Sequence, residues 1–334
     1  MSEGAGVSEG AGVSRPSRQP AVRRPTGVVL MTYGSPSNRE ELVAYLRSVR
    51  GGSEPEPELV EEFLRRYQLV GWSPLIRITT AQGAALQQLL DASHGPGRYR
   101  VEVAMLHSEP SVAAVVERLA AAGVERVIGI VLSPQYSSII MGRYNRALET
   151  ATRGGPSGAD IPVTVAGAWH DLPQFLDALA ERTREALARL PDGGRGVPVL
   201  FTAHSMPKAV VDREPGYVDQ LMETAEAVAK RLGLDAERWQ FAYQSAGHSP
   251  GEWLRPDLKE LFPGLARRGH EAVLVVPVQF LADHLEILYD LDVAAREEAE
   301  EAGIAFHRIE LPNTQPAFIR ALAAVVHRTS SGPS

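Results

Sequence analysis

The sequence contains no cysteine among its 334 residues. This absence excludes disulfide bonds, thiolate zinc sites, a cysteine nucleophile and any cysteine-ligated iron–sulfur cluster. His, Asp, Glu and Tyr therefore remain as the strong metal ligands.

Long hydrophobic runs are also missing. No apolar segment approaches the ~20 residues of a membrane-spanning helix, and the N-terminus has acids and glycines where a signal peptide has a basic and then an apolar stretch. We expect a cytoplasmic protein without stable membrane insertion. The net charge of −7 argues against nucleic acid as a partner.

Several common motifs of catalysis are absent. Neither a Walker loop nor a Gly-x-Gly-x-x-Gly turn follows the apolar runs, and no Gly-x-Ser-x-Gly elbow surrounds Ser205. Nucleotide-dependent chemistry and serine hydrolysis are therefore disfavoured.

The first 25 residues differ in composition from the rest of the chain. Residues 2–7 and 8–13 repeat Ser-Glu-Gly-Ala-Gly-Val, and a stretch rich in arginine and proline follows. Because such a segment cannot bury enough apolar surface to fold, we expect a disordered tail over 1–25. A basic arm that contacts a partner is the alternative, and a solvated tail is favoured.

From Gly27 onward, apolar runs typical of strands alternate with helical stretches rich in Ala, Leu, Arg and Glu. This alternation predicts parallel sheets with helices on both sides. The expected strands are 27–33, 99–106, 126–133, 161–168, 197–203, 239–244, 271–279 and 304–310, and the expected helices include 39–49, 57–69, 80–92, 110–122, 173–190, 216–232 and 282–302.

The two halves of the chain resemble each other. One strand ends in Tyr-Gly-Ser-Pro36 and a later one in His-Ser-Met-Pro207, and each half has a buried strand that ends near Pro-Gln. The predicted fold class is α/β, with two similar Rossmann-like domains that each hold a four-stranded parallel sheet and enclose an interdomain cleft. We assign residues 26–165 and a C-terminal helix at 315–330 to the first domain, and 166–314 to the second.

The strand at 197–203 leads directly to His204. Its apolar run does not alternate, as in a strand covered on both faces, and Pro207 ends the pairing. Ligands bind at the carboxyl ends of parallel strands, so His204 is a candidate for acid–base chemistry or metal binding. The alternative is a histidine that caps the next helix or bonds a loop carbonyl.

The segment 282–302 carries acids at helical spacing. Its carboxylates are predicted to lie on one side of a single helix, namely Asp283, Glu286, Asp290 and Glu297. Because the helix begins at the carboxyl end of a strand, its first turns should line the same crevice as His204. Carboxylates there could bind a divalent cation or pass protons, and a solvated helix face is the alternative interpretation.

Arginines and aromatic residues lie together early in the chain. Arg50 follows one predicted helix, and Arg65, Arg66, Tyr67 and Trp72 lie at the end of the next. Arginine pairs with carboxylates and stacks on π faces, so this group would suit a flat apolar ligand edged with carboxylates. Ordinary surface arginines and a packed tryptophan are the alternative.

Taken together, these segments resemble the ferrochelatase family, and within it the coproporphyrin ferrochelatases. The resemblance runs from about Gly27 to Val326. It depends on the order and spacing of motifs that include Tyr33-Gly-Ser-Pro36, Pro55-Glu-Pro57, Gly71-Trp-Ser-Pro-Leu75, His107-Ser-Glu-Pro110, Ser133-Pro-Gln-Tyr-Ser137, Thr202-Ala-His-Ser-Met-Pro207, Gln244-Ser-Ala-Gly247, Trp253-Leu-Arg-Pro256 and Asp283-His-Leu-Glu-Ile-Leu-Tyr-Asp290.

The resemblance implies a lyase of haem biosynthesis that inserts Fe²⁺ into coproporphyrin III. It implies His204 and Glu286 as catalytic, metal-binding groups on one side of the macrocycle, with Asp290 passing cations or protons from outside. Tyr33 would reach the metal from the other side. The implied porphyrin contacts are Tyr33, Arg50, Arg66, Tyr67, Ser73 and Tyr144. We expect a monomer whose partners are porphyrin and Fe²⁺, with no other cofactor and no iron–sulfur cluster.

The chain departs from the family pattern at two positions. Ala294 stands where relatives extend the acidic row, and Gly51 follows Arg50 where some relatives have a second arginine. A strongly apolar membrane lip, a feature of protoporphyrin enzymes, is not apparent, which favours the four-carboxylate coproporphyrin.

Three alternatives remain open. They are a protoporphyrin IX ferrochelatase, a cobalt or nickel chelatase for another tetrapyrrole, and a non-catalytic tetrapyrrole- or haem-binding protein. Retention of both His204 and Glu286 argues against the last, since a carrier needs one axial ligand and no proton acceptor.

Overall fold

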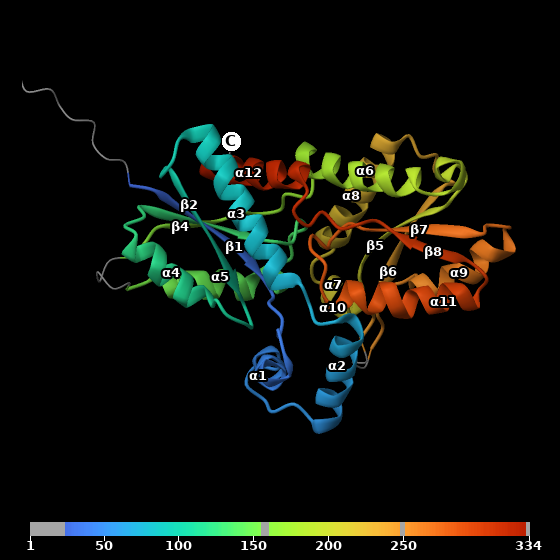
Figure 1. Ribbon diagram of the computed structural model, residues 1–334, viewed down its shortest axis with the longest axis horizontal. Coiled ribbons are helices and arrows are strands. Elements are labelled where there is room, and N and C mark those ends of the chain that lie inside the picture. Colours follow the sequence, from blue (N-terminus) through green and yellow to red (C-terminus); the bar gives the residue numbers. More distant parts are fainter. Residues whose placement is uncertain (1–23, 155–159, 248–250, 332–334) are drawn as a thin grey trace, which may run out of the picture.

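The computed structural model describes residues 24–154, 160–247 and 251–331, which form two sheets side by side (Figure 1). Residues 1–23, most of the tail expected to be disordered, lie outside the described residues. No helix among the described residues is long and apolar enough to cross a membrane.

Each half of the chain forms a four-stranded parallel sheet. The first contains β1 (Thr26–Thr32), β2 (Tyr99–Met105), β3 (Arg126–Val131) and β4 (Val163–Val165), in the order β2-β1-β3-β4. The second contains β5 (Val199–His204), β6 (Trp239–Gln244), β7 (Ala272–Pro277) and β8 (Ala305–Arg308), in the equivalent order β6-β5-β7-β8. The predicted α/β fold with two similar halves is therefore confirmed.

Helices flank both sheets. In the first half they are α1 (Arg39–Val49), α2 (Pro57–Val70), α3 (Leu75–His94), α4 (Val112–Ala121) and α5 (Ser138–Thr152). In the rest of the chain they are α6 (Pro173–Ala188), the 3-10 turn η1 (Pro191–Gly194), α7 (Lys208–Val211), α8 (Gly216–Leu232), α9 (Leu258–Arg267), α10 (Leu285–Leu288), the π-helix η2 (Asp290–Ala295), α11 (Arg296–Glu301) and α12 (Pro316–Ser330).

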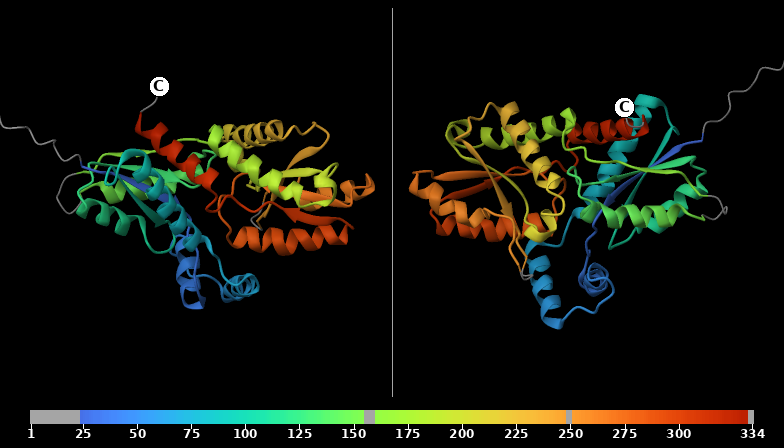
Figure 2. Two further views of the ribbon diagram at one scale, coloured as in Figure 1. Left: turned by 45° about the horizontal axis from the view of Figure 1, so that its top comes forward. Right: turned by 180° about the vertical axis from the view of Figure 1, so that it is seen from behind.

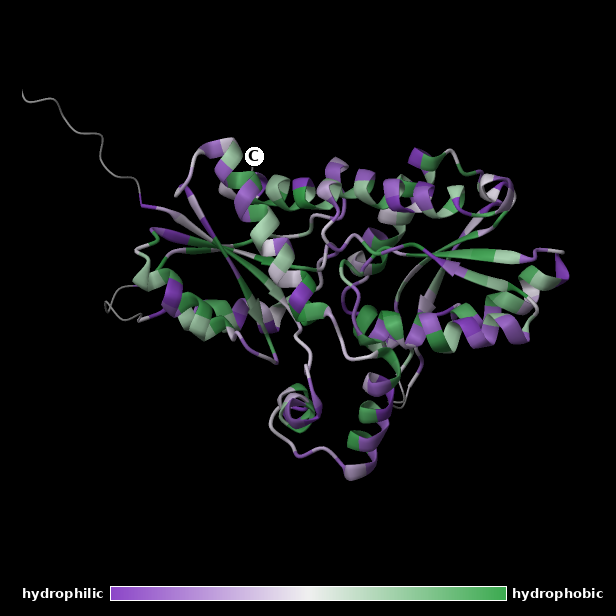
Figure 3. Ribbon diagram, viewed as in Figure 1, coloured by the Kyte–Doolittle hydropathy of each residue, from purple (hydrophilic) through white to green (hydrophobic). Residues whose placement is uncertain are grey.

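One hydrophobic core joins the two halves. Leu30 of the first sheet and Phe201 of the second belong to the same buried cluster. The last helix, α12, packs against both α3 and α6, with Phe318 fully buried (Figure 2). Figure 3 shows apolar residues concentrated in the strands, as expected for sheets covered on both faces. The shared core fixes the relative position of the two sheets.

Helices α1 and α2 project on the side of the molecule opposite α12 (Figures 1 and 2). Pro57 starts α2, where the missing N–H costs no helical bond, and Gly71 ends it in a left-handed conformation with a φ of 74°. Leu64 and Tyr67 of α2 form a buried cluster with Leu285 of α10. This packing brings α2 from the first half against the second half.

The helix predicted over 282–302 is found at 285–301, but as three consecutive elements, α10, η2 and α11, and not as one regular α-helix. Asp283 precedes the helix, since its backbone N–H donates to Asn313 Oδ1 at 3.0 Å and its carboxylate accepts from Asn313 Nδ2 at 2.8 Å. After α10, the carbonyl of Tyr289 accepts from both Val293 N at 3.1 Å and Ala294 N at 3.0 Å. This doubled acceptance widens the turn into η2 and interrupts the regular spacing of the acids.

Candidate active site

A cavity of about 860 Å³ lies between the sheets, within the size range of small-molecule sites. It is lined by residues at the carboxyl ends of β1, β3, β5, β6 and β7, which are Tyr33, Ser133, His204, Ser245 and Gln279 respectively. Parallel sheets bind ligands at this edge because the strands end together there. Residues of α1, α2 and α10 form other parts of the wall.

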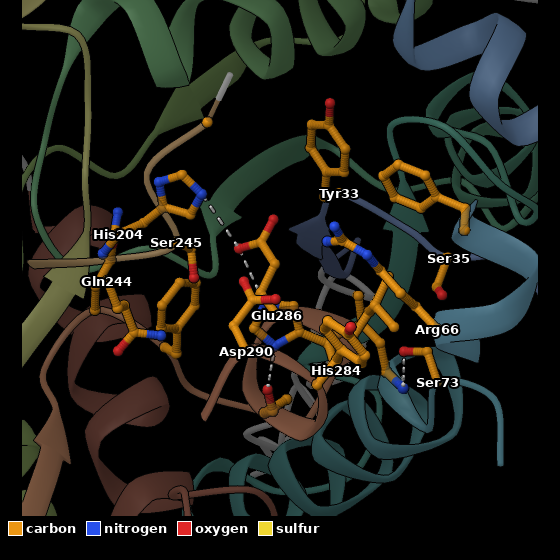
Figure 4. A pocket seen from close by; sticks show the side chains of 18 of the residues that line it. Tyr33, Ser35, Arg66, Ser73, His204, Gln244, Ser245, His284, Glu286 and Asp290 are labelled. Carbon is orange, nitrogen blue, oxygen red and sulfur yellow. Dashed lines mark hydrogen bonds and ion pairs between the residues drawn. The ribbon is translucent and has the colours of Figure 1, made fainter. Parts of the chain in front are cut away.

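His204 is the last residue of β5. Its backbone N–H donates to Gln279 Oε1 at 3.0 Å, and Gln279 Nε2 in turn donates to the hydroxyl of Tyr217 at 2.6 Å. Because the carbonyl of Ser205 can only accept, the His204 Nδ1 that contacts it carries a proton. The ring therefore presents Nε2 toward Glu286, whose Oε2 lies 3.9 Å away (Figure 4).

Glu286 lies in α10 between two imidazoles. Its Oε2 is 3.9 Å from His204 Nε2 and 3.5 Å from His284 Nε2 (Figure 4). Desolvation alone would raise the pKa of Glu286, but the two histidines outweigh it and lower that pKa to about 2. The side chain is 44% exposed and lines the cavity, so its accessible surface faces the ligand space. Glu286 is thus an anion at neutral pH.

His284 is a site residue that the sequence patterns did not single out. Its Nδ1 contacts the carbonyl of Ala282 at 3.0 Å, which leaves Nε2 to face Glu286, and its ring packs on Phe280 with centroids 4.8 Å apart. Burial would lower the pKa of His284, but the hydrogen bond and charge of Glu286 raise it. His284 therefore places a second imidazole beside the same carboxylate oxygen.

Asp290 lies beyond Glu286 and also lines the cavity. Desolvation raises its pKa, and the charge of Glu286 raises it further. Asp283 and Glu297 are not among the described residues that line the cavity. The first turns of the segment thus line the cavity as predicted through Glu286 and Asp290, but not through Asp283.

Tyr33 lies on the wall across from His204 and Glu286 (Figure 4). Its ring packs edge-on against His107, with centroids 4.5 Å apart, and 38% of the residue is exposed. Desolvation raises the pKa of Tyr33, so the phenol keeps its proton at neutral pH. The next residue must be glycine, since Gly34 has a φ of 93° and a Cβ there would lie 2.7 Å from Ser108 Oγ.

The predicted porphyrin contacts divide into two groups. Arg66, Tyr67, Ser73 and Tyr144 line the cavity, whereas Arg50 is exposed after α1 and is not among the described lining residues. Tyr67 stacks on Trp72 with ring centroids 5.4 Å apart. The guanidinium of Arg66 lies over Tyr289, 4.8 Å from its ring centroid, and that of Arg65 donates to the Tyr289 hydroxyl at 2.9 Å. Cations thus lie where α2 meets α10.

Residues 25–330 match a family model described as Ferrochelatase. The chain belongs to the ferrochelatase family. The ferrochelatase of Herpetosiphon aurantiacus is 39% identical to it, over 90% of this chain and 98% of the relative. The coproporphyrin III ferrochelatases of Geobacillus kaustophilus and Bacillus subtilis are 35% and 33% identical, each over 91% of this chain and over 96% and 97% of the relatives. Membership confirms the resemblance and makes the chain a metal chelatase, which is a lyase.

Solved chelatase structures share the fold. The sirohydrochlorin chelatase SirB from Bacillus subtilis subspecies spizizenii, in complex with cobalt, has a TM-score of 0.54 at 12% identity, over 92% of this chain and 97% of that one. CbiX, described as the terminal enzyme of siroheme biosynthesis in denitrifying bacteria, has a TM-score of 0.52 at 14% identity, over 93% of this chain and 100% of that one. At these identities the likeness concerns the ferrochelatase chain's fold alone.

The contact between Glu286 and His284 predicts a titration. In the metal-free chain, NMR should show the His284 imidazole titrating above its ordinary pKa of 6.5. Glu286→Gln removes the carboxylate that contributes most to raising this pKa, so the midpoint should then move downward. An unchanged His284 midpoint in Glu286→Gln would contradict the contact.

The same contact predicts how stability varies with pH. Because the folded-state pKa of His284 is raised, its pairing with Glu286 stabilises the fold below pH 6.5, and this contribution is lost as pH rises through the folded value. Glu286→Gln should therefore destabilise the fold more at about pH 5.5 than at about pH 8.5 in thermal melts. The exposed Glu61→Gln is the control and should show no such difference.

Proposed function

We propose that the chain inserts Fe²⁺ into coproporphyrin III to give the iron porphyrin used in haem biosynthesis. The observation that carries this proposal is the pair of imidazoles beside Glu286 on one wall of the cavity, across from Tyr33. A non-catalytic binder has no use for several proton acceptors at one point.

Metal insertion requires that a porphyrin lose two pyrrole protons and that Fe²⁺ lose its water. His204 supports the first step, because its Nε2 is basic, faces the cavity and has an anion 3.9 Å away to stabilise the imidazolium that forms. Because its pKa is about 2, Glu286 stays an anion that stabilises this imidazolium, and the proton leaves His204 to solvent through the cavity that His284 and Asp290 also border. His204 is restored each time its proton leaves, so two protons are released per metal inserted.

The metal ligands that the site offers are His204, Glu286 and Tyr33. Imidazole and carboxylate suit divalent iron, and no cysteine is available to compete for it. Among the described residues no preformed group of three or more His, Asp or Glu has the arrangement of a metal site. Iron is here a substrate, and four of its final ligands are the porphyrin nitrogens.

The four carboxylates of coproporphyrin III match the cations near α2. Arg66 lines the cavity and Arg65 lies beside it on Tyr289. Relatives named coproporphyrin III ferrochelatase also support this substrate. Protoporphyrin IX is the second candidate, because apolar side chains line the cavity near the same helix, namely Val49, Leu59 and Phe63.

Anaerobic metallation with purified protein tests the proposal. Fe²⁺ should convert coproporphyrin III faster than protoporphyrin IX, as followed by the absorbance change on metallation. Porphyrin binding without turnover would favour a carrier, and preference for protoporphyrin IX would favour the second candidate. A monomeric state and a cytoplasmic location are parts of the same proposal, tested by light scattering and by cell fractionation.

A further inference from the structure

Arg66 is held in a fixed position at the cavity wall. Its guanidinium is packed over the Tyr289 ring at 4.8 Å and near the Phe63 ring at 5.7 Å, and its side chain is only 24% exposed. Stacking on aromatic faces limits its rotamers, so little entropy is lost when an anion binds. The position suits recognition of a carboxylate at the edge of a flat ligand.

On one edge of this guanidinium, one of the two N–H donors already has a hydrogen-bond partner. A carboxylate that binds side-on uses Nε–H and Nη2–H together. In the structure Nη2 donates to Oε1 of Glu62, one helical turn earlier in α2, whereas Nε is buried without a hydrogen-bond partner among the described residues. A second carboxylate cannot take both donors of this edge while Glu62 remains.

Glu62 is placed to respond to the ligand. It lines the same cavity as Arg66, and its side chain is 42% exposed, so it has space to turn away. Glu61, its neighbour in sequence, instead contacts Arg39 at 3.7 Å, with both side chains about 70% exposed at 69% and 71%. The two acids therefore carry the same charge on one helix, but only one of them lies at the ligand space.

We propose that Glu62 is a specificity-determining residue that competes with a porphyrin carboxylate for the side-on edge of Arg66. This inference rests on the proposed function and extends it. The carboxylate of a bound substrate displaces Glu62 and accepts hydrogen bonds from both Nε and Nη2 of Arg66. The displaced Glu62 anion stays nearby, and its negative charge weakens the binding of substrate and product. Porphyrins without a carboxylate at this edge cannot displace Glu62, so Arg66 does not strengthen their binding.

The test measures binding of metal-free porphyrin by quenching of protein fluorescence. Glu62→Gln should lower the Kd for coproporphyrin III by about 2- to 5-fold, the fold-change that corresponds to a partly exposed ion pair. Glu62→Ala, which leaves no side-chain acceptor, should lower it at least as much. Glu61→Gln, the matched control for loss of one charge from α2, should leave Kd unchanged.

The role of Arg66 is checked by combining substitutions. Once Arg66→Met is present, adding Glu62→Gln should no longer lower Kd, because the contested edge is gone. A Kd that rises in Glu62→Gln would show that Glu62 holds Arg66 in place, and an equal gain in Glu61→Gln would show a general charge effect. Either result overturns the inference.

Failure of this inference and failure of the proposed function are distinguishable. If the unaltered protein does not metallate coproporphyrin III, the proposed function fails whatever the Glu62 variants do. If it metallates normally but Glu62→Gln binds no tighter, only the competition at Arg66 is refuted.

Discussion

Replacing His204 with alanine should lower kcat for metal insertion by about 10²- to 10⁴-fold, the usual contribution of a single general base. The reason is geometric, since His204 presents its Nε2 to the cavity with Glu286 behind it at 3.9 Å. Porphyrin affinity should change little, because the carboxylate contacts proposed at Arg66 come from α2 and do not involve His204. Stopped-flow metallation and fluorescence binding separate these two effects.

A matched control is available elsewhere in the fold. His170 Nε2 contacts Glu223 at 2.8 Å, which is also a histidine–carboxylate pair, but neither residue is among the described residues that line the cavity. His170→Ala should retain kcat in the fraction of protein that folds, as measured by thermal melting. Metallation that survives His204→Ala with porphyrin binding unchanged would remove His204 from the chemistry.

Much of the fold can be predicted because the strands are apolar on both faces. Val199, Leu200 and Phe201 have no exposed surface, and this burial accounts for the continuous apolar run that marks β5. The order of the strands is not encoded in any one segment. The strand order was therefore not predicted, whereas the likeness of the two halves was, and the equal strand orders confirm that likeness.

Helix α5 was not among the predicted helices. It buries Met141, Tyr144 and Leu148 on one side. Ser137 and Ser138 at its N-terminus both donate to Glu214 of the second half. The acids at 283–297 keep helical spacing in the sequence, but hydrogen bonds to the distant Asn313 hold Asp283 outside the helix. Tertiary interactions override local propensity in this segment.

The site was predictable where a side chain follows directly from its strand. His204 and Tyr33 end β5 and β1, so the parallel topology places both at the cavity. His284 was not predictable, because its direction depends on the carbonyl of Ala282, which its Nδ1 contacts. Arg50 was expected at the porphyrin, but its place after α1 leaves it exposed. Its role stays a prediction.

Replacing Arg308 with methionine should reduce the free energy of unfolding by about 3–5 kcal/mol, as expected when one member of a buried ion pair is removed. Arg308 Nε and Nη2 each donate to the Asp292 carboxylate at 2.6 Å, and Nη2 lies 3.3 Å from Asp283. The side chains of Arg308, Asp292 and Asp283 are 14%, 28% and 20% exposed, respectively. Without Arg308, two poorly solvated carboxylates lose their counter-charge, and urea denaturation measures the loss.

The control is Arg189→Met, since Arg189 pairs with Glu310 at 3.0 Å but both side chains are more than half exposed, at 63% and 58%. That pair should contribute at most about 1 kcal/mol. Adding Asp292→Asn to Arg308→Met should restore part of the stability, because one uncompensated charge is removed. Asp292 belongs to η2, which directly follows the helix of Glu286. Loss of its pairing should therefore also disturb Glu286, so kcat should fall together with stability in Arg308→Met. Equal losses in Arg308→Met and Arg189→Met would mean that this network does not anchor the catalytic wall.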